Sequence, residues 1–240
     1  MRTRAGIILQ ARFGSSRLPG KALMPIGGRT VLEHCLRRLM FAGVAPVVLA
    51  TTSRPEDDAL EAVARALGVG VFRGDTNDVL GRYLNAAEAF DFDTIIRATG
   101  DNPCVDIQAP GRLLEALRSH HADYAWEDGL PYGAAVEAVT RDALTRAGHE
   151  TYHAEDREHV TLYVRRSTHD FRVLLTPAPV PLRRPDVRLT VDTAADLEHV
   201  RALYARTGVD MPSLRRFIEA AGRPARTEAC PPQPWRRRVA

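Results

Sequence analysis

Short apolar runs alternate with longer amphipathic segments along the first half of the chain. The apolar runs have the length of buried strands, and they occupy residues 5–9, 47–51, 69–72 and 94–99. The amphipathic segments repeat their apolar residues at helical spacing, and they span residues 31–42, 55–67 and 77–90. Strands that alternate with helices of this length form βαβ units. We therefore expect an α/β fold whose mainly parallel central sheet is flanked by helices.

The second half of the chain is less regular, and its elements are predicted from local signals. Pro110 starts a helix, and Thr193 with the following Asp196 caps another that runs through Tyr204. Further helices are expected at 155–166 and 213–221, and strands at 123–126, 171–175 and 187–191. No linker interrupts the sequence before about residue 222. We expect residues 1–222 to form a single domain and the Pro- and Arg-rich residues 223–240 to form an irregular tail.

Composition and charge exclude several classes of protein. No apolar run approaches the roughly 20 residues that span a bilayer, and the N-terminus lacks the pattern of a signal peptide. Three scattered cysteines are typical of a reducing compartment, so we expect a cytoplasmic protein. The formal net charge is only +3, and Arg alternates with Asp and Glu along most of the chain. This alternation indicates a solvated surface of mixed sign, so we expect no binding to nucleic acid or membrane.

The loop at residues 11–21 is the strongest candidate for chemistry. It follows the first predicted strand and holds two glycines, two serines, two arginines and a lysine within 11 residues. Lys21 is the only lysine among the 33 Lys and Arg residues of the chain. Glycines such as Gly14 permit backbone N–H groups to approach an anion, while Arg12, Arg17 and Lys21 supply the charge that a triphosphate needs. The loop matches neither a P-loop nor a dinucleotide fingerprint, and the alternative interpretation is an ordinary surface loop.

Polar residues follow other predicted strands at the edge where ligands bind in open α/β sheets. Thr51 ends the second strand, Asp101 follows the fourth, and Asp192 follows a late one. Both aspartates also have a structural interpretation. Asp101 precedes Asn-Pro and can be a turn residue, and Asp192 precedes Thr193 and can favour a helix N-terminus.

These residues fall in one ordered set of motifs. Residues 10–21 read Gln-Ala-Arg-x-x-Ser-x-Arg-Leu-Pro-Gly-Lys. This run strongly resembles the signature of the cytidylyltransferases, which include the CMP-Kdo and CMP-sialic acid synthetases, and in particular their spore-coat-polysaccharide branch. Further matches occur in order at residues 50–52, 72–74, 78–83, 99–103, 157–161 and 189–193. The resemblance covers about residues 5 to 205, nearly the whole predicted domain.

The resemblance implies a Rossmann-like (GT-A-like) nucleotidyltransferase fold. It also implies transfer of CMP from CTP to an acidic sugar, sugar phosphate or phosphonate, with release of pyrophosphate. Catalytic phosphate contacts fall on Arg12, Arg17 and Lys21, and ligands for a Mg²⁺ cofactor on Asp101 and Asp192. Nucleotide contacts are assigned to Leu9, Gln10, Ala11, Gly14, Ser15, Thr51, Arg82, Thr99 and Gly100. Acceptor contacts are assigned to Asn102, Glu137, Glu158 and His159. Related enzymes are often dimers, so we expect a homodimer with acceptor and dimer contacts within about residues 128–188.

Several alternatives stay open on the sequence. Arg82 on a helix can be a solvated surface charge, and His159 can be structural. Ala135 stands where the related pattern often has a second acidic residue, so the acceptor is not defined. A nucleotidyltransferase that uses another nucleotide and a non-catalytic nucleotide-binding protein remain alternatives. A glycosyltransferase is disfavoured because Asp101 is not part of an Asp-x-Asp motif.

Overall fold

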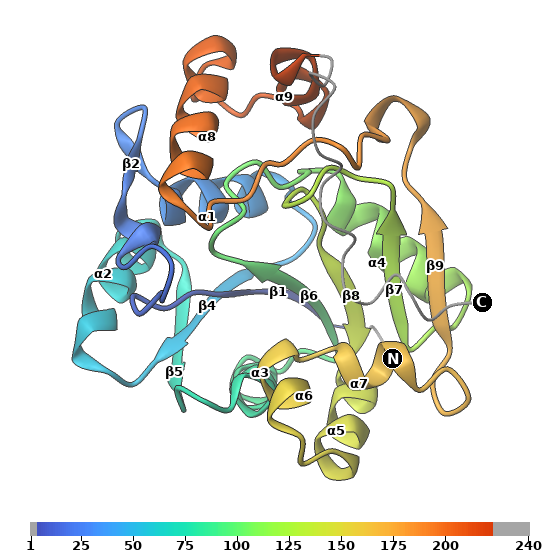
Figure 1. The fold of residues 1–240 in the computed structure, drawn as a ribbon. Helices are drawn as coiled ribbons and strands as arrows, with labels where there is room; N and C mark the ends of the chain where they lie inside the picture. Colours follow the sequence, from blue (N-terminus) through green and yellow to red (C-terminus); the bar gives the residue numbers. More distant parts are fainter. Residues whose placement is uncertain (1–3, 223–240) are drawn as a thin grey trace.

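A seven-stranded sheet forms the centre of the molecule (Figure 1). The computed structural model describes residues 4–222 of the 240-residue chain. The strands of the sheet are β1 (Ala5–Gln10), β4 (Val47–Thr52), β5 (Gly70–Gly74), β6 (Thr94–Thr99), β7 (Tyr124–Asp128), β8 (Glu137–Thr140) and β9 (Val173–Pro177). Their order is β5-β4-β1-β6-β8-β7-β9. A separate small hairpin joins β2 (Pro25–Ile26) to β3 (Arg29–Thr30).

The sheet is mainly parallel, as the alternation of strands and helices predicts. β1 pairs in parallel with β4 on one side and with β6 on the other, and β5 extends the sheet beyond β4 in the same direction. β8 is antiparallel to both of its neighbours, β6 and β7, while β7 and β9 pair in parallel. The predicted α/β class and the Rossmann-like arrangement are confirmed.

Helices cover both faces of the sheet. The α-helices are α1 (Val31–Phe41), α2 (Asp58–Ala66), α3 (Val79–Ala89), α4 (Ala109–Ser119), α5 (Arg141–Glu150), α6 (Ala154–His159), α7 (Leu162–Arg166), α8 (Ala194–Thr207) and α9 (Leu214–Ala221). Short 3-10 turns add η1 (Lys21–Leu23), η2 (Pro55–Asp57) and η3 (Val180–Leu182). Within the described residues, no helix is long and apolar enough to cross a lipid bilayer.

Alternate residues of β1 face two separate hydrophobic cores, because successive side chains of a strand point to opposite faces. Ile7 and Leu9 pack in one core with the buried residues of α1, α2, α4, α8 and α9. Ile8 packs in the other core with α3, α5 and α7. Burial on both faces explains why β1 reads as a continuous apolar run in the sequence.

The order of strands reverses between β1 and β6. From β1 the chain moves outward through β4 to β5, and it then returns to place β6 on the opposite side of β1. The loops that leave β1 and β6 approach closely here. The Gly100 amide donates to the Gln10 carbonyl over 2.8 Å, and a Cβ added at Gly100 would lie 2.7 Å from the Ala11 Cβ. Glycine is therefore required at this position, which is where open sheets bind their ligands.

Several element predictions were wrong in the second half. The single helix expected at 155–166 is two helices, α6 and α7, because the backbone breaks at Val160, which has a φ of 53°. The strand expected at 187–191 is not formed; these residues pair with a loop, with one bridge between Arg188 and Tyr132. Their apolar character reflects burial of Val187, Leu189 and Val191 rather than membership of a ladder. β8 and α5 were not predicted.

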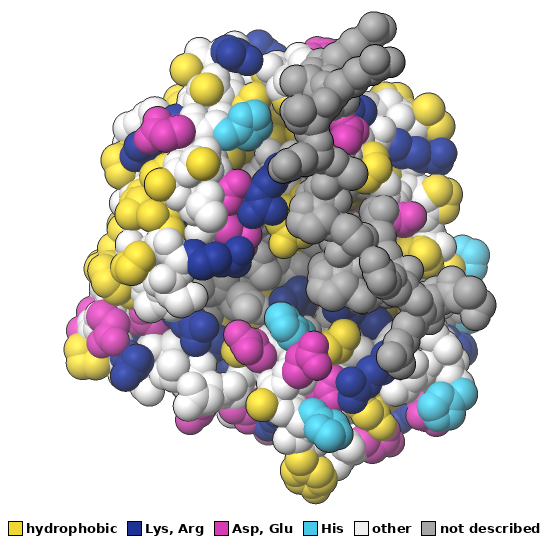
Figure 2. All heavy atoms as spheres, viewed as in Figure 1, with side chains coloured by type: hydrophobic (Ala, Val, Ile, Leu, Met, Phe, Trp, Pro, Cys, Tyr) yellow, Lys and Arg dark blue, Asp and Glu magenta, His cyan; other side chains and the backbone are white. Residues whose placement is uncertain are grey.

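Capping boxes open two helices, and the one predicted at Thr193 is confirmed. Thr30 with Glu33 forms the capping box of α1, and Thr193 with Asp196 forms that of α8. The predicted irregular tail, residues 223–240, lies outside the described residues. Figure 2 shows basic and acidic side chains interspersed over the face seen in Figure 1, as the alternation of charges in the sequence predicts.

Candidate active site

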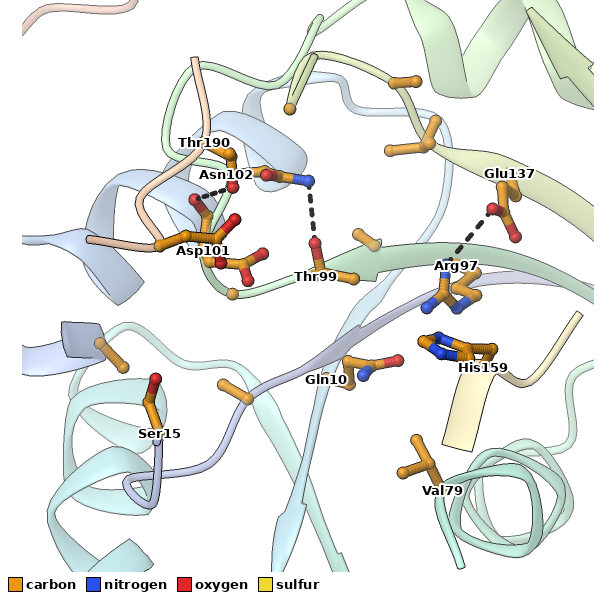
Figure 3. A pocket seen from close by; sticks show the side chains of 18 of the residues that line it. Gln10, Ser15, Val79, Arg97, Thr99, Asp101, Asn102, Glu137, His159 and Thr190 are labelled. Carbon is orange, nitrogen blue, oxygen red and sulfur yellow. Dashed lines mark hydrogen bonds and ion pairs between the residues drawn. The ribbon is translucent and has the colours of Figure 1, made fainter. Parts of the chain in front are cut away.

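A cavity of about 480 Å³ lies at the ends of β1 and β6, where the strand order reverses. Figure 3 shows its lining, with Gln10 at the end of β1 and Thr99 at the end of β6. Most residues predicted for the site line this cavity. They are Gln10, Ala11, Arg12, Gly14, Ser15, Arg17, Lys21, Arg82, Thr99, Gly100, Asp101, Asn102, Glu137, Glu158, His159 and Asp192. The fold thus brings together residues from five motifs that are far apart in the sequence.

The Lys21 ammonium lies between two carboxylates. Its Nζ is 2.9 Å from Asp101 Oδ2 and 3.1 Å from Asp192 Oδ1. Burial alone would lower the pKa of Lys21, but the charges and hydrogen bonds of Asp101 and Asp192 outweigh it and raise the pKa. Lys21 therefore carries a positive charge at the C-terminal end of the loop.

Asp192 is held by three cations, two from the loop at 11–21 and one from the segment before α8. Besides Lys21, Arg17 Nη2 lies 3.0 Å from Oδ1, and Arg188 Nη2 lies 2.9 Å from Oδ2. Arg188 also stacks over the Tyr132 ring at 4.8 Å, which fixes its guanidinium. The capping box of α8 is formed by Thr193 and Asp196, so capping does not explain the Asp192 carboxylate, and the side chain is directed at the loop cations.

Asp101 and Asp192 fit the donor set that Mg²⁺ requires. They are 91 positions apart, yet both carboxylates reach the same ammonium group. Mg²⁺ is commonly held by one or two carboxylates together with substrate phosphates and water. Among residues 4–222, no group of three or more His, Cys, Asp or Glu side chains is arranged to hold a metal. A cation held by these two carboxylates would take its other ligands from a bound phosphate and from water.

Comparison with known proteins identifies the family. The model of the cytidylyltransferase family matches residues 6–219, which is most of the chain. The chain belongs to the cytidylyltransferase family. The resemblance seen in the sequence motifs is confirmed.

Relatives and solved structures agree with the family model. The spore coat polysaccharide biosynthesis protein SpsF of Bacillus subtilis is 37% identical over 207 residues, which are 84% of this chain and 86% of that protein. A cytidylyltransferase of Leptospira borgpetersenii has a TM-score of 0.85 at 32% identity and covers 91% of this chain and 93% of its own. A CMP:2-keto-3-deoxy-manno-octonic acid synthetase complexed with CTP has a TM-score of 0.64 at 25% identity, covering 85% of this chain and 99% of that one.

The basic loop of this cytidylyltransferase is anchored by Asp57, which is not among the residues predicted for the site. The Asp57 carboxylate is buried and accepts hydrogen bonds from the Thr52 hydroxyl, the Phe13 amide at 2.7 Å, the Thr51 hydroxyl at 2.9 Å and the Thr52 amide at 3.0 Å. Burial would raise the pKa of Asp57, but these hydrogen bonds lower it. In the sequence Asp57 looks like an acidic residue of a helix first turn, and no local signal distinguishes it.

Two predicted nucleotide contacts are not placed in the cavity. Thr51 is fully buried and gives its hydroxyl to Asp57, so it supports the loop instead of lining the cavity. Leu9 is fully buried in the hydrophobic core behind β1. The side chains of Thr51 and Leu9 therefore support residues that line the cavity and do not line it themselves.

Arg82 of α3 is a buried charge that lines the cavity. Its side chain donates from Nη1 to the Asp75 carbonyl at 2.7 Å, and its Nε has no partner among the described residues. Burial lowers the pKa of Arg82, and the positive charge of Arg12 lowers it further. The alternative of a solvated surface charge is wrong, because only 3% of the residue is exposed.

The other end of the cavity is built on Glu137. Its carboxylate lies 3.3 Å from Arg97 Nη1 and 3.6 Å from Arg165 Nη1, and it accepts a hydrogen bond from the Thr161 hydroxyl. Burial would raise the pKa of Glu137, but Arg97, Arg165 and Thr161 together lower it. Arg97 was missed, although an arginine inside the apolar strand β6 is a signal that the sequence contains. His159 lines the same cavity and lies near Arg97 in the close-up (Figure 3).

Proposed function

We propose that the protein transfers CMP from CTP to an acidic sugar, sugar phosphate or phosphonate, releasing pyrophosphate, with Mg²⁺ as cofactor. One observation carries this proposal: the Lys21 ammonium is shared by Asp101 and Asp192 at the point where the strand order reverses. The arrangement combines cations for a triphosphate with carboxylates for a metal. The neighbour complexed with CTP supports the choice of nucleotide.

The loop cations account for the chemistry of the transfer. A nucleophilic oxygen of the acceptor forms a bond to the α-phosphorus of CTP. The bond from this phosphorus to the oxygen that bridges it to the β-phosphorus breaks, and pyrophosphate leaves. Negative charge builds on the phosphate oxygens during this step, and Arg12, Arg17 and Lys21, which line the cavity, would neutralise it. Asp101 and Asp192 would hold Mg²⁺, which when bound supplies further charge neutralisation.

A pyrophosphate-release screen tests the proposed function. Purified protein is incubated with Mg²⁺, one of the four nucleoside triphosphates, and each member of a panel of acidic sugars, sugar phosphates and phosphonates. We expect release with CTP and at least one acceptor, and much less with UTP, GTP or ATP. Release with another nucleotide in place of CTP would overturn the nucleotide assignment. CTP binding without turnover of any acceptor would indicate a non-catalytic nucleotide-binding protein.

We also propose that the protein acts in the cytoplasm as a homodimer. Cys35 and Cys104 are buried free thiols, which suits a reducing compartment. Leu175 of the edge strand β9 is 50% exposed and Val180 is 72% exposed, and both lie in the segment expected to hold dimer contacts. Light scattering of the purified protein is expected to give twice the mass of one chain, and the mass of a single chain would contradict the dimer.

A further inference from the structure

Both oxygens of Asp192 and one oxygen of Asp101 are paired with cations of the chain. Asp101 Oδ2 and Asp192 Oδ1 contact the same Lys21 Nζ, at 2.9 and 3.1 Å. Asp192 Oδ1 also contacts Arg17 Nη2 at 3.0 Å, while Oδ2 contacts Arg188 Nη2 at 2.9 Å. The carboxylate oxygens that fit Mg²⁺ are therefore the same atoms that bind the Lys21 ammonium.

The ion pair between Lys21 and Asp192 is shielded from solvent. Only 14% of the Lys21 side chain and 7% of the Asp192 side chain are exposed. Water and salt screen a pair in this position less than they screen an exposed pair. The Arg17 side chain is 64% exposed, so its contact with Asp192 is screened more strongly. Lys21 therefore contributes the strongest positive charge from the loop to the two carboxylates.

The charges of this ion-paired cluster balance one another. Its three carboxylates and three cations belong to Asp101, Asp192, Asp196, Lys21, Arg17 and Arg188. A divalent cation that approached the cluster would meet carboxylates that are already neutralised and an ammonium that repels it. Mg²⁺ also gives up its water ligands reluctantly. The cluster therefore disfavours a divalent cation as long as Lys21 stays between the two aspartates.

A triphosphate in the cavity would change this balance. Lys21 and Arg17 belong to the loop that lines the cavity, and phosphate oxygens compete with carboxylates for such cations. The ammonium of lysine sits on a flexible four-carbon chain, so it can turn to a new partner without a change of backbone. Once the loop cations turn to phosphate, Asp101 and Asp192 lose the charge that neutralises them and attract a divalent cation.

We propose that Lys21 closes the metal site of the protein until a triphosphate binds. Without nucleotide, the Lys21 ammonium takes the place of a divalent cation at Asp101 and Asp192. A bound triphosphate draws the ammonium onto its phosphate oxygens and opens the two carboxylates. Binding of metal and of nucleotide is then coupled, and each strengthens the other by the same factor. This inference rests on the proposed function and states how its site is loaded.

Arg188 is a positioning residue that keeps Asp192 in place during this exchange. Its Nε lies 2.7 Å from Asp196 Oδ1, and its guanidinium lies over the Tyr132 ring at 4.8 Å. Neither contact involves the loop, so Arg188 stays on Asp192 Oδ2 when the loop cations leave Oδ1. Asp192 therefore keeps its orientation while its Oδ1 is released.

The first test measures metal binding without nucleotide. Mn²⁺ is the probe, because its electron paramagnetic resonance signal reports the free ion. Lys21→Met is expected to bind Mn²⁺ at least about tenfold more tightly than wild type, because one positive charge beside two carboxylates is removed. Arg17→Gln tightens binding by a smaller factor. Arg215→Gln, at an exposed arginine paired with Glu219 on α9, is the matched control for loss of one charge and keeps the wild-type Kd.

A double variant shows where the Mn²⁺ binds. Combining Lys21→Met with Asp101→Asn removes one of the two carboxylates, so Mn²⁺ binding is expected to fall back to the wild-type level. Tight binding that survives Asp101→Asn would place the ion elsewhere and contradict the proposal.

The second test measures CTP binding by calorimetry, once with EDTA and once with Mg²⁺. With EDTA, Asp101→Asn is expected to bind CTP roughly threefold more tightly than wild type, because Lys21 is released from one carboxylate. With Mg²⁺ the order reverses, because the variant lacks a metal ligand. In the Lys21→Met background, Asp101→Asn changes metal-free CTP binding less, because the ion pair that it disrupts is already gone.

Two further results would overturn the proposal. If Lys21→Met binds Mn²⁺ no more tightly than wild type, Lys21 does not close the site. If Asp101→Asn leaves metal-free CTP binding unchanged or weakens it, the triphosphate does not compete with the carboxylates for Lys21. If Lys21→Met does not fold, Arg17→Gln and the CTP measurements on Asp101→Asn carry the test. Failure of the proposed function is distinguishable, because wild type would release no pyrophosphate with any acceptor while Lys21→Met still gained Mn²⁺ binding.

Discussion

At the scale of single residues, Lys21 shows how far composition can lead. The chain uses one lysine among its 33 Lys and Arg residues, and the structure places that lysine between Asp101 and Asp192. An ammonium is a compact point charge that fits between two carboxylates, whereas the planar guanidinium of arginine does not replace it there. The single lysine of the chain thus stands at a position where two neighbouring carboxylates favour an ammonium group.

Replacing Lys21 by alanine tests its role in the transfer. We expect Lys21→Ala to lower kcat by roughly 10²-fold or more, because a charge contact to the developing negative charge is lost. Arg215→Gln on α9 is the control for loss of one positive charge and is expected to keep wild-type kcat. Steady-state pyrophosphate release measures both, and near wild-type activity of Lys21→Ala would remove this side chain from the mechanism.

Replacing Asp57 tests the anchor of the basic loop. Asp57→Asn removes acceptor capacity from a buried carboxylate that four backbone and hydroxyl donors share. We expect the free energy of unfolding to fall by about 1–3 kcal/mol and the KM for CTP to rise. Asp58→Asn is the matched control, because the adjacent Asp58 side chain is 68% exposed and is expected to tolerate the change. Equal CTP KM values in the two variants would refute the anchoring role.

Residues of the candidate site could be predicted from the sequence only where they belong to a local sequence motif. The loop, Asp101 and Asp192 fall in recognisable runs, and the structure places all of them around one cavity. Asp57 could not be assigned, because its contact with the basic loop is 44 positions away along the chain. Arg97 stands out as a charge in an apolar strand, but its partner Glu137 is 40 positions away and could not be predicted. Thr51 was assigned to the nucleotide because it ends a strand, but its hydroxyl turns to Asp57.

At the scale of elements, the start of α8 connects helix capping to the site. Asp196 accepts from Arg188 and from the backbone amides of Asp192 and Thr193. Burial would raise the pKa of Asp196, but these hydrogen bonds lower it from 3.8 to about 2. The cap therefore fixes the backbone of Asp192 while Arg188 holds its side chain.

The pH dependence of stability tests this connection. Because the pKa of folded Asp196 lies below its unfolded value, the stabilisation is present above pH 3.8 and is lost as pH falls toward about 2. We expect Asp196→Asn to be less stable than wild type by about 1 kcal/mol at neutral pH. Denaturant unfolding should show the two proteins converging through this acidic window. A difference that stays constant with pH would contradict the assignment.

Gly133, in the loop between β7 and β8, tests the close packing behind Asp192. Its φ is +91°, and an added Cβ would lie 2.6 Å from the Thr190 amide nitrogen. We expect Gly133→Ala to reduce the free energy of unfolding by at least about 1 kcal/mol and to lower activity by shifting the chain that carries Asp192. Gly14→Ala is the control for stability, because its Cβ would meet no atom within 4 Å. Equal melting temperatures for the two variants would refute this.

Helices and strands could be predicted where the spacing of apolar residues follows from their burial against the sheet or the core. The first four strands and three helices follow the expected pattern because both sheet faces are covered. The second half departs from it for tertiary reasons. The segment at 187–191 is apolar yet pairs with a loop, and the helix expected at 155–166 breaks at Val160 to bring Thr161 to Glu137.

At the scale of the whole molecule, the reversal of strand order assembles the site. Asp101 follows β6 and Asp192 precedes α8, and only the fold brings both to Lys21. Sequence periodicity predicts a parallel sheet but not which distant loops meet over it. The family motifs supplied that pairing, and the acceptor end of the cavity stayed undefined because its residues come from the irregular segment.

The stoichiometry of the reaction distinguishes CMP transfer from hydrolysis of CTP. With CTP, Mg²⁺ and an acceptor from the screen, mass spectrometry of the acceptor is measured alongside released pyrophosphate. We expect the acceptor to gain one cytidine monophosphate for each pyrophosphate released, and Asp101→Asn to lose most of both. CTP consumption without a CMP-bearing acceptor, or full transfer by Asp101→Asn, would contradict the proposed transfer.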